Sequence, residues 1–302
     1  MNNRTLNKAK AEKNNEFYTQ MADIERELFY YKEHFKDKII YLNCDNPNSN
    51  FFKYFSLNFD FFGLKKLIAT YYDTKNPTYK IELTGYGKEP IKTRLRGNGD
   101  FNNAENIEIL KEADIIVTNP PFSLFRKFIA LMVEYNKKFI VIGNINAVTH
   151  KEIFPLIKTG KIWIGRGFNI TMTFRIPEHY KEWSYIDDNG NKYAKLGGIA
   201  WYTNLKNKKY KEPFLKMLIG NKYDPKKYPK FDDYDAIFVA KKLDIPYDYY
   251  DEMRVPITFI ENYDPKEFEL IGTIGAGGEY NLAKGIINGK AKYKGLIIKR
   301  RK

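Results

Sequence analysis

The residues best suited to chemistry form the run Asp114-Ile-Ile-Val-Thr-Asn119-Pro120-Pro121-Phe122. Its first half is apolar and β-branched, which predicts a buried strand. Its second half predicts a rigid polar turn, because each proline fixes φ at about −65° and has no N–H donor, which leaves carbonyl acceptors available. In an open α/β sheet, ligands bind at the carboxyl ends of the strands. The turn is therefore the first candidate for a functional site.

This turn suits an exocyclic amine on an aromatic base. Asn119 adds a side-chain carbonyl acceptor, and Phe122 adds a flat apolar face on which a base can stack. The lone pair of such an amine is delocalised into the ring, so the amine is a poor nucleophile. Two acceptors that hold its hydrogens can rotate the lone pair towards an electrophile. An ordinary strand-to-helix turn with two prolines is the alternative interpretation.

Composition limits the class of protein. The 302 residues suffice for one large or two modest domains. A formal net charge of +14 predicts a polyanionic partner, although an AT-rich genome that favours lysine is an alternative source of the charge. No stretch reaches the roughly 18–20 apolar residues of a membrane span, and the N-terminus lacks the apolar core of a signal peptide. We expect a cytoplasmic protein with no membrane partner.

The cysteine and histidine content gives no reason to expect a metal. Cys44 is the only cysteine, so it cannot form an internal disulfide, as suits the cytoplasm. The three histidines, His34, His150 and His179, are scattered along the chain. We therefore expect no zinc site or other bound metal.

An alternation of apolar strands and amphipathic helices predicts a mostly parallel sheet. The expected elements of this sheet are a helix at 21–35, buried strands at 38–45, 65–73 and 138–144, an edge strand at 79–84 and a helix at 125–135. Shorter strands are expected at 161–165, 172–176 and 199–203, with a hairpin-type turn at 187–191. The basic run 206–211 is the predicted domain boundary, because the α/β rhythm is lost beyond it.

Three acidic residues, Asp45, Asp73 and Asp100, are predicted at strand or turn ends before the proline turn. In a doubly wound sheet, a carboxylate after the second strand typically binds ribose hydroxyls. One after the third can accept from the amine of a base. Taken singly, each could be a solvated turn residue, but their order beside the turn indicates an adenosine-containing cofactor. The sequence has neither phosphate-binding motif, GxxxxGK[ST] or GxGxxG, so S-adenosylmethionine, with its electrophilic methyl, fits best.

The ordered set of motifs resembles the amino-directed DNA methyltransferases, specifically the EcoRI-type adenine-N6 family. Asn119-Pro120-Pro121-Phe122 resembles the catalytic motif of that family, and Phe17-Tyr18-Thr19 resembles its N-terminal cofactor motif. Asp45-Asn46-Pro47 opens a degenerate first motif, in which Ser49 and Phe51 replace the glycines of most S-adenosylmethionine enzymes. Asp100-Phe101 resembles the adenine-contacting motif. The resemblance covers most of the chain.

The resemblance implies an α/β, class I S-adenosylmethionine-dependent methyltransferase fold with a smaller C-terminal DNA-recognition domain. Residues 1–205 would form the catalytic, cofactor-binding domain and residues 206–302 the target-recognition domain. The implied activity is site-specific methylation of a flipped-out adenine at N6 in double-stranded DNA, of restriction-modification or orphan epigenetic type. The implied setting is a bacterial or phage-type cytoplasm, associated with the nucleoid. A cognate restriction endonuclease, where one exists, would act separately.

The expected site residues follow from these motifs. The catalytic residues are Asn119, Pro120, Pro121 and Phe122. The cofactor-binding residues are Phe17, Tyr18, Thr19, Asp45, Asn46, Pro47, Asp73, Asp100, Phe101 and Asn119. The candidates for stacking on the other face of the base are Phe168 and Phe174, and the candidates for DNA contact are Lys206, Lys208, Lys209 and Lys211.

Other functions compete with this hypothesis. One is methylation of a protein amide or of RNA, although such enzymes usually keep the glycine-rich first motif. Another is a non-catalytic DNA-binding protein on a decayed methyltransferase fold. Cytosine-C5 methylation needs a cysteine nucleophile, and Cys44 has no preceding proline. Cytosine-N4 methylation uses the same amine chemistry, but Asn rather than Ser at position 119 favours adenine.

Overall fold

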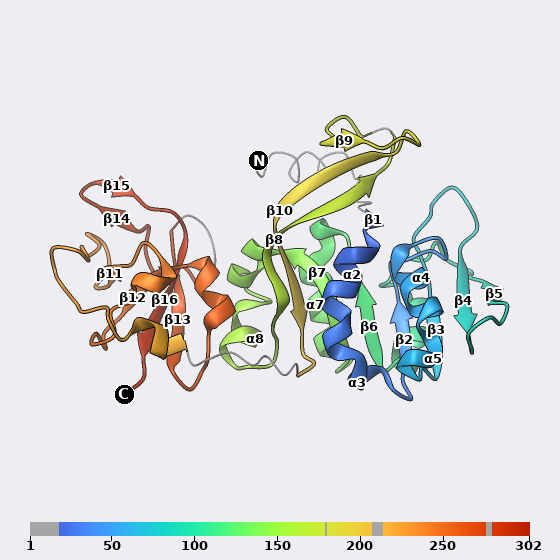
Figure 1. Cartoon of the computed structure of the whole chain (residues 1–302), viewed down its shortest axis with the longest axis horizontal. Coiled ribbons are helices and arrows are strands. Elements are labelled where there is room, and N and C mark those ends of the chain that lie inside the picture. The colour runs from blue at the N-terminus through green and yellow to red at the C-terminus, as the bar shows by residue number, and fades with distance from the viewer. Residues whose placement is uncertain (1–17, 179, 207–213, 276–279) are drawn as a thin grey trace. The chain divides into compact units, whose positions relative to one another are not determined.

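The computed structural model describes residues 18–178, 180–206, 214–275 and 280–302 (Figure 1). The chain folds into two compact units. The first comprises residues 1–144 and 164–208, and the second comprises residues 145–163 and 209–302. We predicted a catalytic domain at residues 1–205 and a target-recognition domain at residues 206–302. These functional assignments stay predictions.

The first unit is built on a ten-stranded sheet in the order β1-β8-β10-β7-β6-β2-β3-β4-β5, with β9 beside β10 (Figure 1). Four strands at its centre pair in parallel: β7 (Lys138–Asn144), β6 (Ile115–Thr118), β2 (Ile39–Leu42) and β3 (Lys66–Ala69). Every residue of β6 and β2 is buried, as continuous apolar runs require in a sheet covered on both faces. The predicted α/β sheet with parallel strands is confirmed for these four strands, but the sheet as a whole is mixed rather than mostly parallel, because the strands on either side pair antiparallel.

Antiparallel strands extend this sheet on both sides. On one side β3 pairs with β4 (Tyr79–Leu83), and β4 pairs with β5 (Ile91–Arg94). The strand predicted at 79–84 is confirmed as β4, but its predicted place at the edge of the sheet was wrong, since β5 lies outside it. All four residues of β5 are exposed, so no apolar alternation marked this strand in the sequence.

On the other side, β7 pairs antiparallel with β10 (Lys192–Thr203), which neighbours β8 (Trp163–Ile176), and β1 (Tyr18–Thr19) closes the sheet. The strands predicted at 161–165 and 172–176 are parts of the single 14-residue strand β8. The predicted turn at 187–191 is confirmed, because it joins β9 (Tyr185–Ile186) to β10.

Helices cover the sheet of the first unit. The helix expected at 21–35 is divided into α2 (Met21–Leu28), the 3-10 turn η1 (Phe29–Tyr31) and α3 (Lys32–Phe35). The others are α4 (Asn50–Leu57), α5 (Phe59–Phe62), α6 (Ala104–Glu112) and α7 (Phe125–Glu134), with η2 (Phe122–Leu124) leading into α7. Phe35 makes edge-to-face contacts with Phe55 and Phe62, each at a centroid distance of 5.3 Å. These rings place much of the aromatic content in the core.

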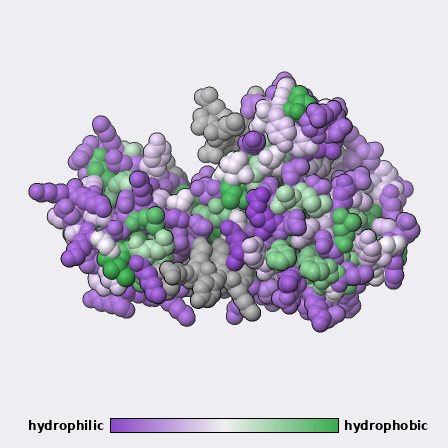
Figure 2. Space-filling view, in the orientation of Figure 1, coloured by the Kyte–Doolittle hydropathy of each residue, from purple (hydrophilic) through white to green (hydrophobic). Residues whose placement is uncertain are grey.

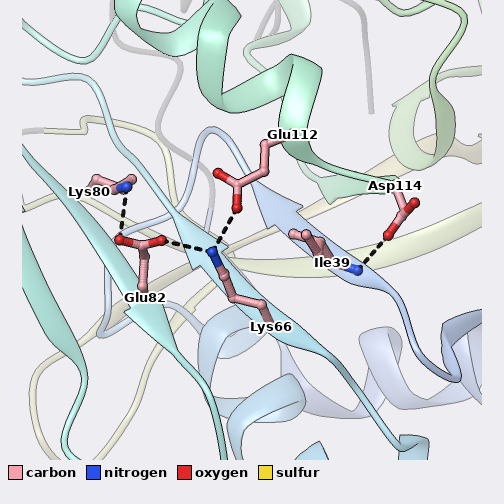
Figure 3. A network of polar contacts seen from close by, with 6 residues as sticks. All are labelled: Ile39, Lys66, Lys80, Glu82, Glu112 and Asp114. Atoms are coloured by element: carbon pink, nitrogen blue, oxygen red, sulfur yellow. Dashed lines mark hydrogen bonds and ion pairs between the residues drawn. The ribbon is translucent and has the colours of Figure 1, made fainter.

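Ionic contacts join the strands at the amino end of the parallel sheet (Figure 3). Lys66 Nζ contacts Glu112 at 2.6 Å and Glu82 at 3.3 Å, and Lys80 contacts the same Glu82 at 2.8 Å. Asp114 accepts a hydrogen bond from the backbone N–H of Ile39 at 2.8 Å, which links the starts of β6 and β2. The charged groups at this end are thus paired with one another, in contrast to those at the carboxyl end.

The second unit contains a four-stranded sheet in the order β11-β12-β16-β13 and a separate hairpin of β14 and β15. The strands are β11 (Ile237–Phe238), β12 (Met253–Pro256), β13 (Phe268–Ile274), β14 (Ile286–Ile287), β15 (Lys290–Ala291) and β16 (Gly295–Arg300). Its helical segments are η3 (Ile145–Thr149), α8 (Phe154–Lys158), η4 (Phe214–Leu218), η5 (Lys242–Asp244) and η6 (Ile257–Asn262). The expected loss of α/β rhythm is confirmed for the described residues from 214 onward.

Candidate active site

The proline turn lies at the carboxyl end of β6, between the parallel strands β2 and β7. The Pro121 carbonyl accepts a hydrogen bond from the N–H of Leu124 at 2.8 Å, which starts η2. Phe122 is partly buried and meets Phe174 of β8 edge-on, with centroids 6.5 Å apart and an interplanar angle of 89°. Backbone hydrogen bonding and ring packing therefore hold this turn in one conformation.

A buried hydrogen bond connects the turn to the loop after β2. Thr118, the last residue of β6, donates from Oγ1 to Asp45 Oδ2 at 2.6 Å. The Asp45 N–H donates to the Thr70 carbonyl at 3.0 Å, which adds the end of β3. Burial raises the pKa of Asp45 to about 7, although hydrogen bonds from Thr118 and Ser49 act in the opposite direction. Asp45 can therefore change its charge near neutral pH.

The chain of buried polar groups continues from Thr70 across the sheet. The hydroxyls of Thr70 and Tyr41 lie 2.7 Å apart, and Tyr41 donates to Asn106 Oδ1 at 3.4 Å. Because the tyrosine has one hydroxyl hydrogen, the threonine then donates to it. Asn106 Nδ2 donates to the Asp100 carbonyl at 2.7 Å. One network thus links the loop beside the Asn119–Phe122 turn to the predicted adenine-binding loop.

The loops that carry Asp73 and Asp100 lie side by side. The Asp73 N–H donates to the Asn98 carbonyl at 3.0 Å. Gly99 adopts a φ of +75°, and a Cβ there would lie 1.9 Å from the Tyr71 carbonyl oxygen. Only glycine fits this backbone approach, so this residue fixes the distance between the two loops.

Both of these carboxylates accept hydrogen bonds within their own turns. The Asn76 side chain and the N–H groups of Lys75 and Asn76 donate to Asp73 and lower its pKa. Asp100 Oδ1 accepts from the N–H and the side chain of Asn102 at 2.9 and 3.1 Å. Phe101 beside it is 5% exposed and packs against Phe128. The roles of these residues in cofactor binding stay predictions.

The predicted N-terminal cofactor motif is described from Tyr18 onward, and Phe17 lies outside the described residues. Thr19 pairs with Phe174 of β8, and its carbonyl accepts from Asn50 Nδ2 at 2.8 Å. The buried Thr19 hydroxyl has no hydrogen-bond partner in the described part of the chain. An orphaned hydroxyl at this position is suited to a bound ligand.

The loop of the first motif is held by hydrogen bonds among its own residues. Ser49 Oγ accepts from the Phe52 N–H at 3.1 Å and caps α4. Asn46 accepts from the Asn48 N–H through its side chain and from the Ser49 N–H through its carbonyl, and Pro47 between them is partly buried. The loop that lacks the usual glycines is thus stabilised by side-chain hydrogen bonds.

The two predicted base-stacking rings are both buried in this structure. Phe174 is fully buried behind Phe122, and Phe168 is 7% exposed. Near Phe168, Glu27 of α2 accepts hydrogen bonds from the N–H groups of Arg166 and Gly167 at 2.8 and 2.7 Å. The stacking role of either phenylalanine stays a prediction, and the support from Glu27 was missed because no motif marks it.

The predicted DNA-contact run is described only at its start. Lys206 is exposed, and its carbonyl lies 2.5 Å from His34 Nε2. Lys208, Lys209 and Lys211 lie outside the described residues.

Sequence reasoning did not identify four residues of the buried hydrogen-bond network, which are Tyr41, Thr70, Asn106 and Thr118. A polar residue within or just after an apolar strand was a usable signal for three of them.

Other features of the described residues bear on the chemistry. Burial, and then the nearby Asp45, raise the pKa of the Cys44 thiol well above its usual range, which disfavours the thiolate that a cysteine nucleophile needs.

Among residues 18–178, 180–206, 214–275 and 280–302, no group of three or more His, Cys, Asp or Glu side chains is arranged to hold a metal ion. None of the helices in this part of the chain has the length and apolar character needed to cross a bilayer.

Comparison with known proteins agrees with this geometry. The family model described as adenine-specific methyltransferase EcoRI matches residues 5–301. The Type II methyltransferase M.EcoRI of Escherichia coli is 44% identical, over 99% of this chain and 97% of its own length. M.MgeORF184P of Mycoplasma genitalium is 42% identical, over 98% of each chain, and M.MpnI of Mycoplasma pneumoniae is 42% identical, over 88% of this chain and 84% of its own. No solved structure gives a significant match.

Proposed function

Because the chain belongs to the EcoRI family of adenine-specific methyltransferases, we propose that it methylates adenine at N6 at specific sites in double-stranded DNA. The mixed sheet with a parallel centre is consistent with a class I methyltransferase fold. The observation that carries the proposal is the rigid Asn119–Phe122 turn at the carboxyl end of β6, tied to the first-motif loop by the bond from Thr118 to Asp45.

In this reaction the turn acts by orientation and charge stabilisation. The Asn119 side-chain carbonyl and the Pro120 carbonyl accept the two amine hydrogens of adenine and direct its lone pair towards the methyl group. Positive charge grows on the amine as the new bond forms, so acceptors fixed in advance stabilise the transition state more than the ground state. Transfer is direct and in line, and no residue of the turn forms a covalent intermediate.

S-adenosylmethionine, when bound, supplies an electrophilic methyl on a sulfonium. The residues present fit that group: the Thr19 hydroxyl is a buried donor and acceptor with no partner in the described residues, and Asp45 is a buried carboxyl. A cation beside Asp45 would favour its ionised form. Phe17, Tyr18, Asn46, Pro47, Asp73, Asp100, Phe101 and Asn119 complete the proposed cofactor site.

The target adenine leaves the helix to reach this turn. The turn is wedged between parallel strands and Pro120 is buried, so a base stacked within a duplex cannot approach it. Extrusion costs a few kcal/mol, which stacking on Phe122 offsets in part. We propose that Phe174 supports Phe122 from behind, since their edge-on contact fixes the stacking face.

Residues 206–302 are proposed to recognise the DNA sequence, with phosphate contacts from the Lys206–Lys211 run. Support comes from the formal charge of +14 and from the change of architecture in the described residues after 213. Lys206, Lys208, Lys209 and Lys211 would position the protein on the backbone without reading bases. A restriction endonuclease encoded with the gene would cleave the same sequence when unmethylated.

The catalytic assignment is tested with the turn itself. DNA from cells with and without the protein is sequenced for modified bases, and methyl transfer is then measured for the parent, Asn119→Ala and Asn119→Asp. We expect N6-methyladenine at one sequence motif and a fall in kcat of about 100-fold or more for the alanine variant. The aspartate variant retains an acceptor oxygen and serves as the matched control, with a smaller loss.

Two results would contradict the proposal. One is the absence of N6-methyladenine in DNA exposed to the purified parent protein and S-adenosylmethionine. The other is near-parent turnover by Asn119→Ala.

A further inference from the structure

The segment from Tyr280 to Lys302 is strongly basic. It contains eight lysine and arginine residues and no aspartate or glutamate. In the second unit this segment forms β14, β15 and β16 (Figure 1). Figure 2 shows hydrophilic side chains projecting from the rim of this unit. The net positive charge of this segment favours a polyanionic partner.

The β14–β15 hairpin within this segment is held in a defined position. Ile287 pairs with Lys290 across a two-residue turn, in which Asn288 and Gly289 have φ of 50° and 72°. Both angles suit the type I′ turn of tight hairpins. Asp232 accepts from the Gly289 N–H at 3.0 Å, and Asp233 accepts from the N–H groups of Gly285 and Ile286 at the same distance. The hairpin is therefore anchored to the loop at 232–233.

Tyr293 follows this hairpin and is 92% exposed, more than any other large apolar or aromatic side chain among the described residues. Its backbone, in contrast, is firmly held. Arg254 of β12 is 4% exposed and donates from Nη2 to the carbonyls of Tyr293 and Lys294 at 2.7 and 3.1 Å. A Cβ on Gly295 would lie 2.1 Å from Arg254 Nε, so this glycine makes room for the guanidinium.

A buried arginine that carries only backbone hydrogen bonds is costly to desolvate, and burial lowers the pKa of Arg254 to about 10. Its effect here is to fix the peptide beneath an exposed ring. A ring on a fixed backbone loses little conformational freedom when it binds a partner, so such residues serve well as anchors. The lysines around this anchor, Lys284 and Lys290 exposed and Lys292 partly so, favour an anionic partner over an apolar one.

We infer that the β14–β15 hairpin and Tyr293 form a docking surface for duplex DNA. Lys284, Lys290 and Lys292 contact phosphates, and the Tyr293 ring packs against the sugars and base edges beside them. This inference rests on the proposed function, since it names a surface through which the enzyme would hold its substrate. It is independent of the Lys206–Lys211 run.

The test measures binding of the full-length protein to unmethylated plasmid DNA over a range of salt concentrations. Tyr293→Ala should raise Kd by about fivefold or more, as truncation of an aromatic anchor at an interface typically does. The double variant Lys290→Gln, Lys292→Gln should lower the slope of log K against log salt by about two, because each phosphate that a lysine neutralises contributes about 0.9 to that slope. Tyr293→Phe should bind almost as well as the parent.

Tyr86 and Lys88 provide a matched control, because they are an exposed tyrosine and an exposed lysine in one loop of the first unit. Tyr86→Ala and Lys88→Gln should keep the parent Kd and salt slope. Parent-like binding by both hairpin variants would overturn the inference even if the parent methylates DNA. Weakened binding confined to the hairpin variants supports it whatever the outcome for Asn119→Ala, so the two proposals fail separately.

Discussion

Each compact unit holds an irregular segment in place with one buried ionisable side chain, and the two side chains have opposite charges. In the first unit the Asp45 carboxylate accepts from Thr118 and so fixes the start of the Asn119–Phe122 turn. In the second, the Arg254 guanidinium donates to the carbonyls of Tyr293 and Lys294 and fixes the segment after the hairpin. Neither forms a salt bridge within the described residues.

The difference lies in how each group responds to burial. A carboxyl can become neutral by taking up a proton, and the pKa of Asp45 lies at about 7. A guanidinium keeps its charge at any physiological pH, and Arg254 does so even with its pKa lowered to about 10. The first device can therefore respond to pH or to a bound cation, whereas the second is permanent. That contrast suits the proposed catalytic site, where charge changes during the reaction, and the inferred docking surface, where a fixed backbone favours binding.

The largest loss of stability is expected at Gly99, where two backbone segments of the first unit approach each other closely. Gly99→Ala would place a Cβ 1.9 Å from the Tyr71 carbonyl oxygen at a φ of +75°. Left-handed strain of about 1–2 kcal/mol and overpacking of about 1–3 kcal/mol should together reduce the free energy of unfolding by about 3 kcal/mol or more. Denaturant unfolding followed by circular dichroism measures the change.

Gly87→Ala is the matched control for that variant, since Gly87 has a φ of +70° and no atom lies within 4 Å of the position that a Cβ would take there. It should cost only the strain, about 1 kcal/mol. Equal losses at the two glycines would show that the close approach of the two loops does not constrain the site.

A smaller loss is expected when the arginine of the second unit is removed. Arg254→Met keeps much of the side-chain volume but leaves the carbonyls of Val239, Tyr293 and Lys294 without this donor, so we expect a loss of about 2–3 kcal/mol. Arg301 donates to the Pro265 carbonyl from an exposed position, and Arg301→Met should change stability by less than about 0.5 kcal/mol. Equally small losses for both variants would contradict the comparison of the two units, because Arg254 would then not stabilise the segment at Tyr293 and Lys294.

A pH dependence of stability is expected for Asp45 but not for Arg254, so it separates the two buried groups. The pKa of Asp45 is about 7 in the folded protein and ordinary, near 3.8, when unfolded, so unfolding releases a proton between these values. Its contribution is present in full below about pH 4 and is lost as pH rises towards 7, a change on the order of 4 kcal/mol. Asp45→Asn should remove this slope, as unfolding at pH 4.5 and 7.5 would show.

Asp73 should change stability with pH in the opposite direction to Asp45. Its pKa is lowered in the fold, so its contribution is present above the unfolded pKa and is lost as pH falls through the lower, folded value. Asp73→Asn should leave the slope between pH 4.5 and 7.5 unchanged. A parent protein with no slope in this window would show that Asp45 is ionised in the fold, like an ordinary surface carboxylate.

The central sheet was predictable because its signal is local. The runs at 38–45, 114–119 and 138–144 are apolar over their length and end in polar residues, and they became β2, β6 and β7. β5 was not predictable, since its exposed residues carry no alternation and it exists only through pairing with β4. The long strand β8 was read as two pieces because polar residues interrupt its apolar pattern.

The candidate site likewise contains residues that the sequence marks clearly and residues that it does not. Asn119–Phe122 and the acidic strand ends stand out as residue types at recognisable places. The role of Tyr41 is harder to predict, because it depends on Thr70 and Asn106, which lie 29 and 65 residues away in the sequence. Arg254 lies within the second sheet, and nothing in its neighbourhood in the sequence points to the carbonyls about 40 residues later that it binds.

The outer strands of the ten-stranded sheet also affect how the protein behaves at high concentration. An open sheet edge can recruit a strand from another molecule and start aggregation. Here one end of the sheet is β5, where Lys92 and Arg94 are exposed and Lys92 Nζ lies 4.0 Å above the Tyr79 ring. The positive charges on β5 therefore oppose edge-to-edge association at this end of the sheet, which protects a protein rich in aromatic and β-branched residues from forming intermolecular sheets there.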